Sequence, residues 1–434
     1  MKNGAQLSAE QRLLLALLGR RREPRDKAEM LSLLYSVNWP TFLNITSEDL
    51  YPYVAFSLEP YHGLLEAPPE WEQLCKARRF TAVQNLLLRH ELGKILHALQ
   101  ERGIPAFALK GIVLAYSAYP DLSLRPMTDL DLLVPPNRRA DAVEVLHTLE
   151  YKYPEGSLAI NRDHQLRLGP DQELAPSLRL RDSTVLIEIH SQLECSEPLF
   201  RMPIEEFWSR SIVADLNGLR VETLCPEDFL FHVCLHLSRS HRFEKGLLPL
   251  VDLRLLLESR SDWNWADIAE RSSRYRCATW MYLTLDVARD LVGATVPDSF
   301  FHALPKPHDL TKLRCLIDQQ IWSAISRQRV PLFVPFLLAE SSWQRRARLI
   351  LNRARFVGKR ELDPGLTFAS LVRRTRLSLR RLLATVRVKI PLYAEAWKAG
   401  RLKFHRLLRY AALLRSSNAL FQQIEEETTR EDGS

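Results

Sequence analysis

Cysteine is scarce in this sequence, and the spacing of the cysteines excludes two common uses. Six cysteines occur among 434 residues, and no two of them form a Cys-x-x-Cys pair. They are Cys75, Cys195, Cys225, Cys234, Cys277 and Cys315. This scatter argues against a zinc ribbon and against a disulfide framework. We therefore expect reduced cysteines that pack in the core.

Long apolar runs are also missing. The longest clean runs cover residues 13–18 and 330–339, which is short of the roughly 20 residues that a bilayer span needs. The chain starts with a largely polar segment, and the apolar run that follows is too short for a secretory signal. We expect no transmembrane helix, no export and a cytoplasmic location.

Glycine and proline are too few for a collagen-like or low-complexity chain, at 15 and 25 residues. The content of 46% hydrophobic and 26% charged residues is close to that of an average globular protein. At about 150 residues per domain, the length allows two to three domains.

Positive charge is concentrated near the C-terminus. The net charge is +8, but residues 341–420 hold 20 Lys and Arg against three acids. The rest of the chain is therefore mildly acidic. Arginines interleaved with Leu, Phe and Tyr would suit RNA, an anionic membrane surface or an acidic protein partner. The alternative is a solvated helical face.

The pattern of apolar residues divides the chain into four regions. We expect a helical N-terminal subdomain over residues 1–103, an α/β core over 104–225, a helical bundle over 226–300 and a basic helical extension with an acidic tail over 301–434. Ser8 followed by Gln11 fits a helix capping box. The predicted fold class is α+β, with a small mixed sheet between two helical parts.

A long helix is expected over residues 70–100, with seven apolar residues near one face. They are Leu74, Phe80, Val83, Leu87, Leu92, Ile95 and Leu99. In the core, short β-branched and apolar runs predict strands over residues 104–109, 129–134, 165–168 and 184–189, with helices over 112–118 and 138–149.

The most informative motif is Asp129-Leu130-Asp131 at the start of a strand. Alternate residues of a strand face the same side, so both carboxylates would lie on one surface. Carboxylates held together repel each other and recruit divalent cations, and Mg²⁺ binds one or two carboxylates together with phosphate oxygens. The motif therefore predicts a site for Mg²⁺ or Mn²⁺ and phosphoryl transfer. The alternative is a solvated start of a strand.

Upstream of this pair, Lys110 and Gly111 end one strand and begin a helix. Glycine permits the backbone to approach a phosphate, and a helix N-terminus offers unpaired N–H groups. Arg125 is a further cation that could bind phosphate or a carboxylate. Lys110 could equally be an ordinary surface charge, and Arg125 could instead form a salt bridge with Asp121 or Asp129.

A third carboxylate, Glu188, belongs to the predicted strand over 184–189. It should share a face with Leu186 and His190. If this strand lies beside the Asp129 strand, Glu188 completes a site able to hold two metal ions. A polar residue on a half-exposed strand needs no such role.

Two further residues in the C-terminal helical region are candidates. His236 or His241 could contact the nucleotide or acceptor, and the alternative is that they are core and capping histidines. A zinc site is not expected, because His232 and His236 lack the glutamate of a His-Glu-x-x-His motif. Asp252 is an acid within an apolar helix. Such an acid is either the partner of Arg254 or another arginine, or a general base for the acceptor.

Together these motifs resemble a known group of enzymes. The segments LKG, RPMTDLDLLV, IEIH and PEDFLFHVCLHLSRSH, followed by LVDLRLLLE, are similar to the bacterial family of uncharacterised nucleotidyltransferases, within the polymerase-β and kanamycin nucleotidyltransferase superfamily. The resemblance covers roughly residues 10–300. Two departures are Lys110-Gly111-Ile112 in place of the usual Gly-Ser pair, and glutamate rather than aspartate at position 188.

The resemblance implies NMP transfer from an NTP to an acceptor, with Asp129, Asp131 and Glu188 binding Mg²⁺ or Mn²⁺ and Lys110 and Gly111 at the triphosphate. It does not identify the acceptor. The alternative function is a nucleotide- or RNA-binding module that has lost catalysis and works through its basic region.

Overall fold

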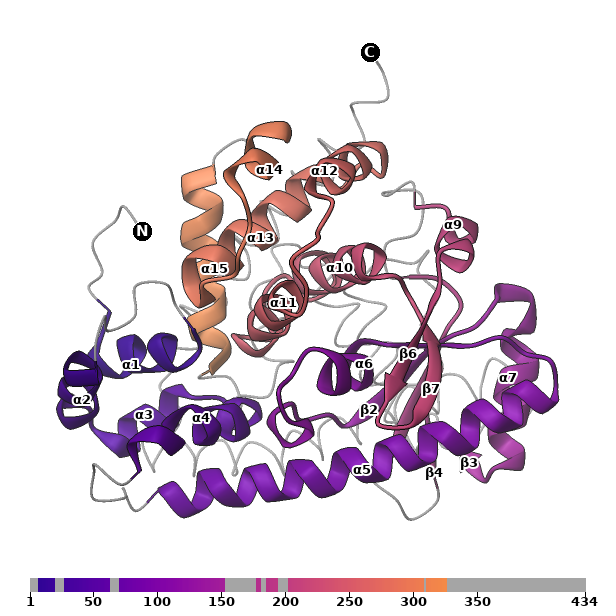
Figure 1. Ribbon diagram of the computed structural model, residues 1–434, viewed down its shortest axis with the longest axis horizontal. Coiled ribbons are helices and arrows are strands. Elements are labelled where there is room, and N and C mark those ends of the chain that lie inside the picture. Colours follow the sequence, from indigo (N-terminus) through magenta and orange to yellow (C-terminus); the bar gives the residue numbers. More distant parts are fainter. Residues whose placement is uncertain are drawn as a thin grey trace, which may run out of the picture. The chain divides into compact units, whose positions relative to one another are not determined.

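The fold is described from a computed structural model. The structure describes residues 7–19, 27–62, 70–152, 177–180, 185–193, 202–307 and 310–325. The predicted strand over 165–168 and the basic residues 341–420 lie outside these ranges. The described part contains many helices, a five-stranded mixed sheet and a two-stranded hairpin (Figure 1). No helix in these ranges is long and apolar enough to span a bilayer.

Short helices form the first part of the chain. They are α1 (Ala9–Leu17), α2 (Lys27–Ser36), α3 (Trp39–Ile45) and α4 (Tyr51–Leu58), with 3-10 turns η1 (Glu48–Leu50) and η2 (Glu59–Tyr61). The predicted capping box begins α1: the Ser8 hydroxyl accepts from the Gln11 amide, and the Gln11 side chain accepts from the Ser8 amide.

The long helix α5 (Trp71–Glu101) corrects one sequence prediction. Leu74, Leu92, Ile95 and Leu99 are buried as expected. Phe80, Val83 and Leu87 are instead 67%, 68% and 39% exposed.

The buried stripe of α5 passes through a polar residue. Asn85 is fully buried because its amide donates to the backbone carbonyls of Leu122 (2.6 Å) and Arg125 (2.9 Å). The buried face of this part of the helix is therefore held by hydrogen bonds as well as by apolar packing.

The central sheet has the order β1-β2-β5-β4-β3. Its strands are β1 (Phe107–Leu109), β2 (Asp129–Leu133), β3 (Tyr151–Lys152), β4 (Ser177–Leu180) and β5 (Leu186–His190). Strands β2 and β5 pair in parallel, and the other neighbours are antiparallel. The first and last predicted strands exist but begin three and two residues later than expected, while β3 and β4 were not predicted.

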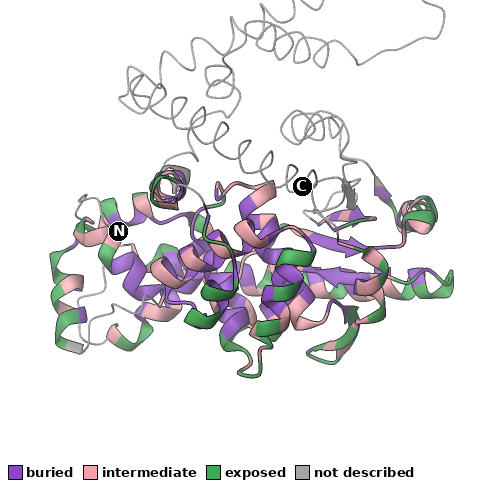
Figure 2. Cartoon of the chain, turned by 90° about the horizontal axis from the view of Figure 1, so that it is seen from above, coloured by how far each residue is buried: buried purple, intermediate pink, exposed green. Residues whose placement is uncertain are grey.

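Helices and a second hairpin surround this sheet. Helix α6 (Lys110–Ser117) begins two residues before the predicted helix, and α7 (Arg139–Thr148) matches the other. The hairpin of β6 (Ile212–Leu216) and β7 (Leu219–Thr223) was not predicted. Its turn is Asn217-Gly218 with φ of +53° and +86°, and this dipeptide is a strong hairpin signal. Figure 2 shows buried residues gathered in the interior of the described part.

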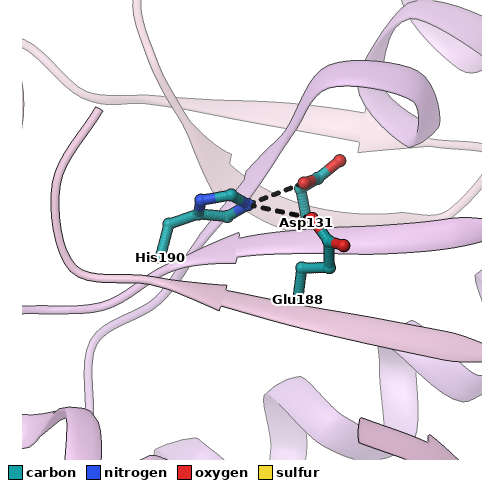
Figure 3. Close-up of side chains that lie close together, drawn as sticks. All are labelled: Asp131, Glu188 and His190. Carbon is teal, nitrogen blue, oxygen red and sulfur yellow. Dashed lines mark hydrogen bonds and ion pairs between the residues drawn. The ribbon is translucent and has the colours of Figure 1, made fainter. Parts of the chain in front are cut away.

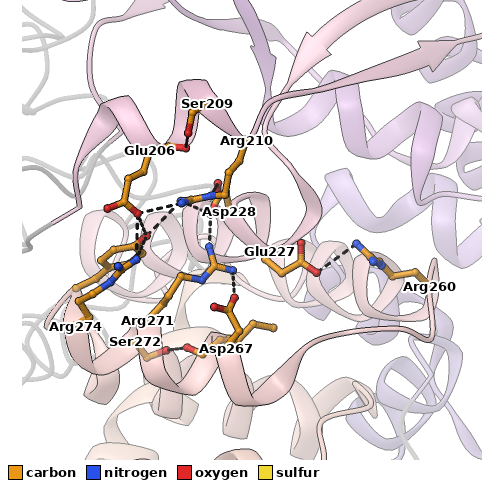
Figure 4. A network of polar contacts seen from close by, with 12 residues as sticks. Glu206, Ser209, Arg210, Glu227, Asp228, Arg260, Asp267, Arg271, Ser272 and Arg274 are labelled. Carbon is orange, nitrogen blue, oxygen red and sulfur yellow. Dashed lines mark hydrogen bonds and ion pairs between the residues drawn. The ribbon is translucent and has the colours of Figure 1, made fainter.

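The last described part is helical again. It comprises α9 (Ile204–Ser209), α10 (Pro226–Leu235), α11 (Leu248–Glu258), α12 (Trp265–Arg274), α13 (Ala278–Val292), α14 (Asp298–Ala303) and α15 (Leu310–Ile325). A π-helical turn, η5 (His236–Ser240), follows α10. The fully buried Asp228 on α10 accepts from Arg210 after α9 (2.9 Å) and from Arg271 on α12 (2.6 Å), which joins these helices (Figure 4).

Candidate active site

The pairing of β2 with β5 brings the acidic residues together. Asp131 lies opposite Glu188 in the parallel register, and Asp129 lies opposite Leu186. Because side chains alternate along a strand and paired residues share a face, Asp129, Asp131 and Glu188 belong to one face of the sheet. The two strands are therefore neighbours, as a three-carboxylate site requires.

Asp131, Glu188 and His190 form a compact group (Figure 3). Asp131 is 5% exposed and His190 is 8% exposed. The His190 Nε2 atom lies 2.7 Å from Asp131 Oδ1 and 3.8 Å from Glu188 Oε2. One potential ligand atom from each residue lies within 4.8 Å of the others. Two carboxylates and an imidazole at this separation are a donor set that fits a divalent cation.

Lys110 places a positive charge on the same group. Its Nζ atom donates to Asp131 Oδ1 at 2.9 Å. Leu109 is the β1 residue opposite Asp131, so Lys110 follows directly where β1 passes into α6. The Lys110 backbone has φ of +51°, a left-handed conformation that is unfavourable for a residue with a Cβ. The chain turns at this position, and the side chain reaches the carboxylate.

The pKa values of the three acids reflect their crowding. Burial and the neighbouring Asp131 carboxylate raise the pKa of Glu188 to about 7. Burial and Asp131 also raise the pKa of Asp129. For Asp131, burial favours a higher pKa, but Lys110 and His190 outweigh it and hold the pKa well below its usual range. Burial and the neighbouring Asp131 carboxylate thus disfavour the ionised forms of Asp129 and Glu188.

Arg125 and Asp252 form a buried ion pair, although they are 127 positions apart in the sequence. The Arg125 Nε and Nη2 atoms donate to the two oxygens of Asp252 at 3.0 and 2.9 Å, and the Tyr119 hydroxyl donates to Asp252 Oδ1 at 2.7 Å. Burial raises the pKa of Tyr119 far above its usual value, and Asp252 adds to this effect. Of the two roles considered for Asp252, arginine partner or general base, the observed contact matches the first.

Gly111 is needed for the same arrangement. A Cβ atom at this position would collide with the Arg125 guanidinium and would lie 2.9 Å from the Met127 sulfur. The absence of a side chain at 111 therefore makes room for Arg125 beside the start of α6.

His236 lies in the π-helical turn after α10, where its Nε2 atom is 3.1 Å from the Nε2 atom of His241. A nucleotide or acceptor contact by His236 stays a prediction.

One functional candidate, His190, was missed in the sequence. His190 lies on the same face of β5 as Glu188 because side chains alternate along a strand, and this alternation was the signal that could have identified it.

The match to a known protein family agrees with the sequence resemblance. Residues 35–293 match the family described as uncharacterised nucleotidyltransferase. Among solved structures, the antibiotic-resistance factor ANT(2'')-Ia is similar with 15% identity and a TM-score of 0.29, covering 44% of this chain and 92% of that one. A search of curated proteins gave no significant match. Because the family match covers more than half of the chain, the protein belongs to the family of uncharacterised nucleotidyltransferases, enzymes that transfer NMP groups.

Proposed function

We propose that the protein transfers NMP from an NTP to an acceptor in a reaction that depends on Mg²⁺ or Mn²⁺ and releases pyrophosphate. The observation that carries this proposal is the register of β2 and β5, in which Asp131 faces Glu188 and Asp129 lies two residues away on the same face. The raised pKa values of Asp129 and Glu188 support it, because they indicate negative charge that a cation would stabilise.

In this proposal Asp129, Asp131 and Glu188 hold the metal, and His190 orients the Asp131 carboxylate. A bound divalent cation neutralises charge on the phosphate oxygens. Lys110 and the backbone at Gly111 bind the triphosphate. An acceptor hydroxyl attacks the α-phosphorus in line, the bond to the β-phosphate oxygen breaks, pyrophosphate leaves and the hydroxyl proton passes to water.

Arg125 and Asp252 have a positioning role in this scheme. Their ion pair favours a structural function for Asp252 over that of a general base, because both carboxylate oxygens already accept hydrogen bonds from Arg125, and one of them also accepts from the Tyr119 hydroxyl. The helical residues 226–300 are proposed to order the acceptor, with His236 as a contact residue.

The experiment is incubation of the protein with α-labelled NTPs, Mg²⁺ or Mn²⁺ and candidate acceptors, with pyrophosphate release as the readout. We expect Asp129→Asn and Asp131→Asn to lower the rate by at least about a hundredfold, because each removes charge at the reacting phosphate. Asp141→Asn is the matched control, since Asp141 pairs with Arg138 and its side chain is 54% exposed. Full turnover in both site variants would overturn the assignment.

A second candidate is a binding module without catalysis. The observation that favours it is the basic composition of residues 341–420, with 20 Lys and Arg. RNA and an anionic membrane surface remain alternative partners for this region. Nucleotide or RNA binding without label transfer would support the module, and a steep loss of affinity with salt would identify phosphate contacts with RNA.

A further inference from the structure

Lys110 and His190 contact the same oxygen of Asp131. Lys110 Nζ is 2.9 Å and His190 Nε2 is 2.7 Å from Asp131 Oδ1. The Lys110 side chain is only 12% exposed. The ammonium group therefore belongs to the buried carboxylate cluster and is not an exposed surface charge.

The carboxylates of Asp129, Asp131 and Glu188 are stabilised by a nearby positive charge even when no metal is bound. Asp131 is 5% exposed, and Asp129 and Glu188 lie close enough to raise each other's energy when ionised. A buried charge without a partner is strongly destabilising. Lys110 supplies the positive charge from a left-handed backbone position, φ +51°, which is unfavourable for a residue with a Cβ.

The two Asp131 partners differ in how easily they can move. His190 is held on β5, within the central sheet. Lys110 is the first residue of α6, and a lysine ammonium sits on a flexible four-carbon chain. Lys110 can therefore leave Asp131 without disturbing the sheet, whereas movement of His190 would disturb β5.

We propose that Lys110 is the resident counter-ion of the metal site, an ammonium group that a divalent cation must displace from Asp131. This inference rests on the proposed function and deepens it. The displaced ammonium loses its carboxylate partner, and the phosphates of a nucleotide offer a new one. Metal binding is therefore weak in the absence of nucleotide and becomes tight when an NTP binds with it, a positive coupling between the two ligands.

The test is Mn²⁺ binding, followed by the electron paramagnetic resonance signal of free Mn²⁺. The full-length wild-type protein and Lys110→Met are titrated with and without an NTP analogue that cannot be hydrolysed at the α-phosphorus. Without nucleotide, we expect Lys110→Met to bind Mn²⁺ about tenfold more tightly than the wild type, because no ammonium competes. The analogue should tighten Mn²⁺ binding about tenfold in the wild type and much less in the variant.

Lys94→Met is the control. Lys94 pairs with Glu91 on α5 at 3.0 Å, and its side chain is 48% exposed, so its loss should leave Mn²⁺ binding unchanged. Equal or weaker Mn²⁺ binding by Lys110→Met without nucleotide would overturn the counter-ion role. If Lys110→Met does not fold, the wild-type titration still tests the counter-ion role. An NTP analogue that does not tighten Mn²⁺ binding by the wild type would also overturn that role.

The outcomes separate this inference from the proposed function. If the wild type binds no Mn²⁺ even with the analogue, the metal site itself is wrong and both proposals fail. If the wild type binds Mn²⁺ and Lys110→Met behaves identically, only the counter-ion role fails.

Discussion

At the residue scale, Asp131 and Glu188 differ in their contacts with the basic side chains Lys110 and His190. Lys110 and His190 both contact Asp131 Oδ1, whereas the shortest His190 distance to Glu188 is 3.8 Å. Lys110 and His190 outweigh the effect of burial and lower the pKa of Asp131, whereas burial and the neighbouring Asp131 carboxylate raise the pKa of Glu188. Such a divergence between neighbouring acids is typical of functional sites.

The raised pKa of Glu188 predicts how the metal-free protein responds to pH. Folded Glu188 holds its proton up to pH about 7, whereas a glutamate in the unfolded chain loses it near 4.5. Between these values the folded protein binds more protons, so the free energy of unfolding falls as pH rises towards 7. Urea unfolding in a metal chelator at pH 5, 6, 7 and 8 measures this. The contribution should vanish in Glu188→Gln.

The comparison with Glu188→Gln isolates this group from the other acids. The stability of the wild type relative to Glu188→Gln should fall between pH 5 and 7 and level off above pH 7. A constant difference, or one that grows with pH, would contradict the raised pKa.

At the scale of the element, α5 has two faces that hydrophobicity alone does not distinguish. Leu88 is fully buried, whereas the adjacent Leu87 is 39% exposed. Asn85 on the buried face is held by the carbonyls of Leu122 and Arg125. The helix therefore supports the segment that leads into β2, and its outer apolar residues contribute little to that contact.

Leu87 and Leu88 offer a matched test of this rotation. Leu88→Ala should lower the free energy of unfolding by about 2–5 kcal/mol, because it removes buried side-chain volume. Leu87→Ala should change it by about 0.5 kcal/mol or less, as is usual for a surface position. Urea denaturation of both variants gives the two values. Similar losses in the two would mean that α5 presents a different face to the core.

At the scale of the whole described unit, one ion pair connects residues that are 127 positions apart. Arg125 precedes β2, and Asp252 lies on α11 in the C-terminal helical part. Tyr119 donates to the same carboxylate from the end of α6. The segment that leads to Asp129 and Asp131 is thus tied to the helices that follow the sheet.

Asp252→Ala should lower the free energy of unfolding by about 3–5 kcal/mol, because it leaves the buried Arg125 guanidinium without this carboxylate. The control is Asp262→Ala, which breaks an exposed pair with Arg260 and should change stability little. Urea denaturation and the rate of pyrophosphate release are measured together. A large loss of turnover with unchanged stability would instead identify Asp252 as a general base.

The sequence by itself determined the local features whose causes are local. The capping box of Ser8 and Gln11 and the alternation that places Asp129 and Asp131 on one face follow from neighbouring residues. The family resemblance needed only the order of such short motifs along the chain. The Asn217-Gly218 turn was equally local, and its hairpin could have been predicted.

Only the tertiary structure decided which distant groups meet. The partner of Asp252, the contact of Lys110 with Asp131 and the register that sets Glu188 opposite Asp131 each depend on how separate strands and helices pack. Periodicity in a sequence specifies the face on which a side chain lies. It does not specify what that face contacts, because the contact is chosen by the burial and hydrogen bonding of the whole chain.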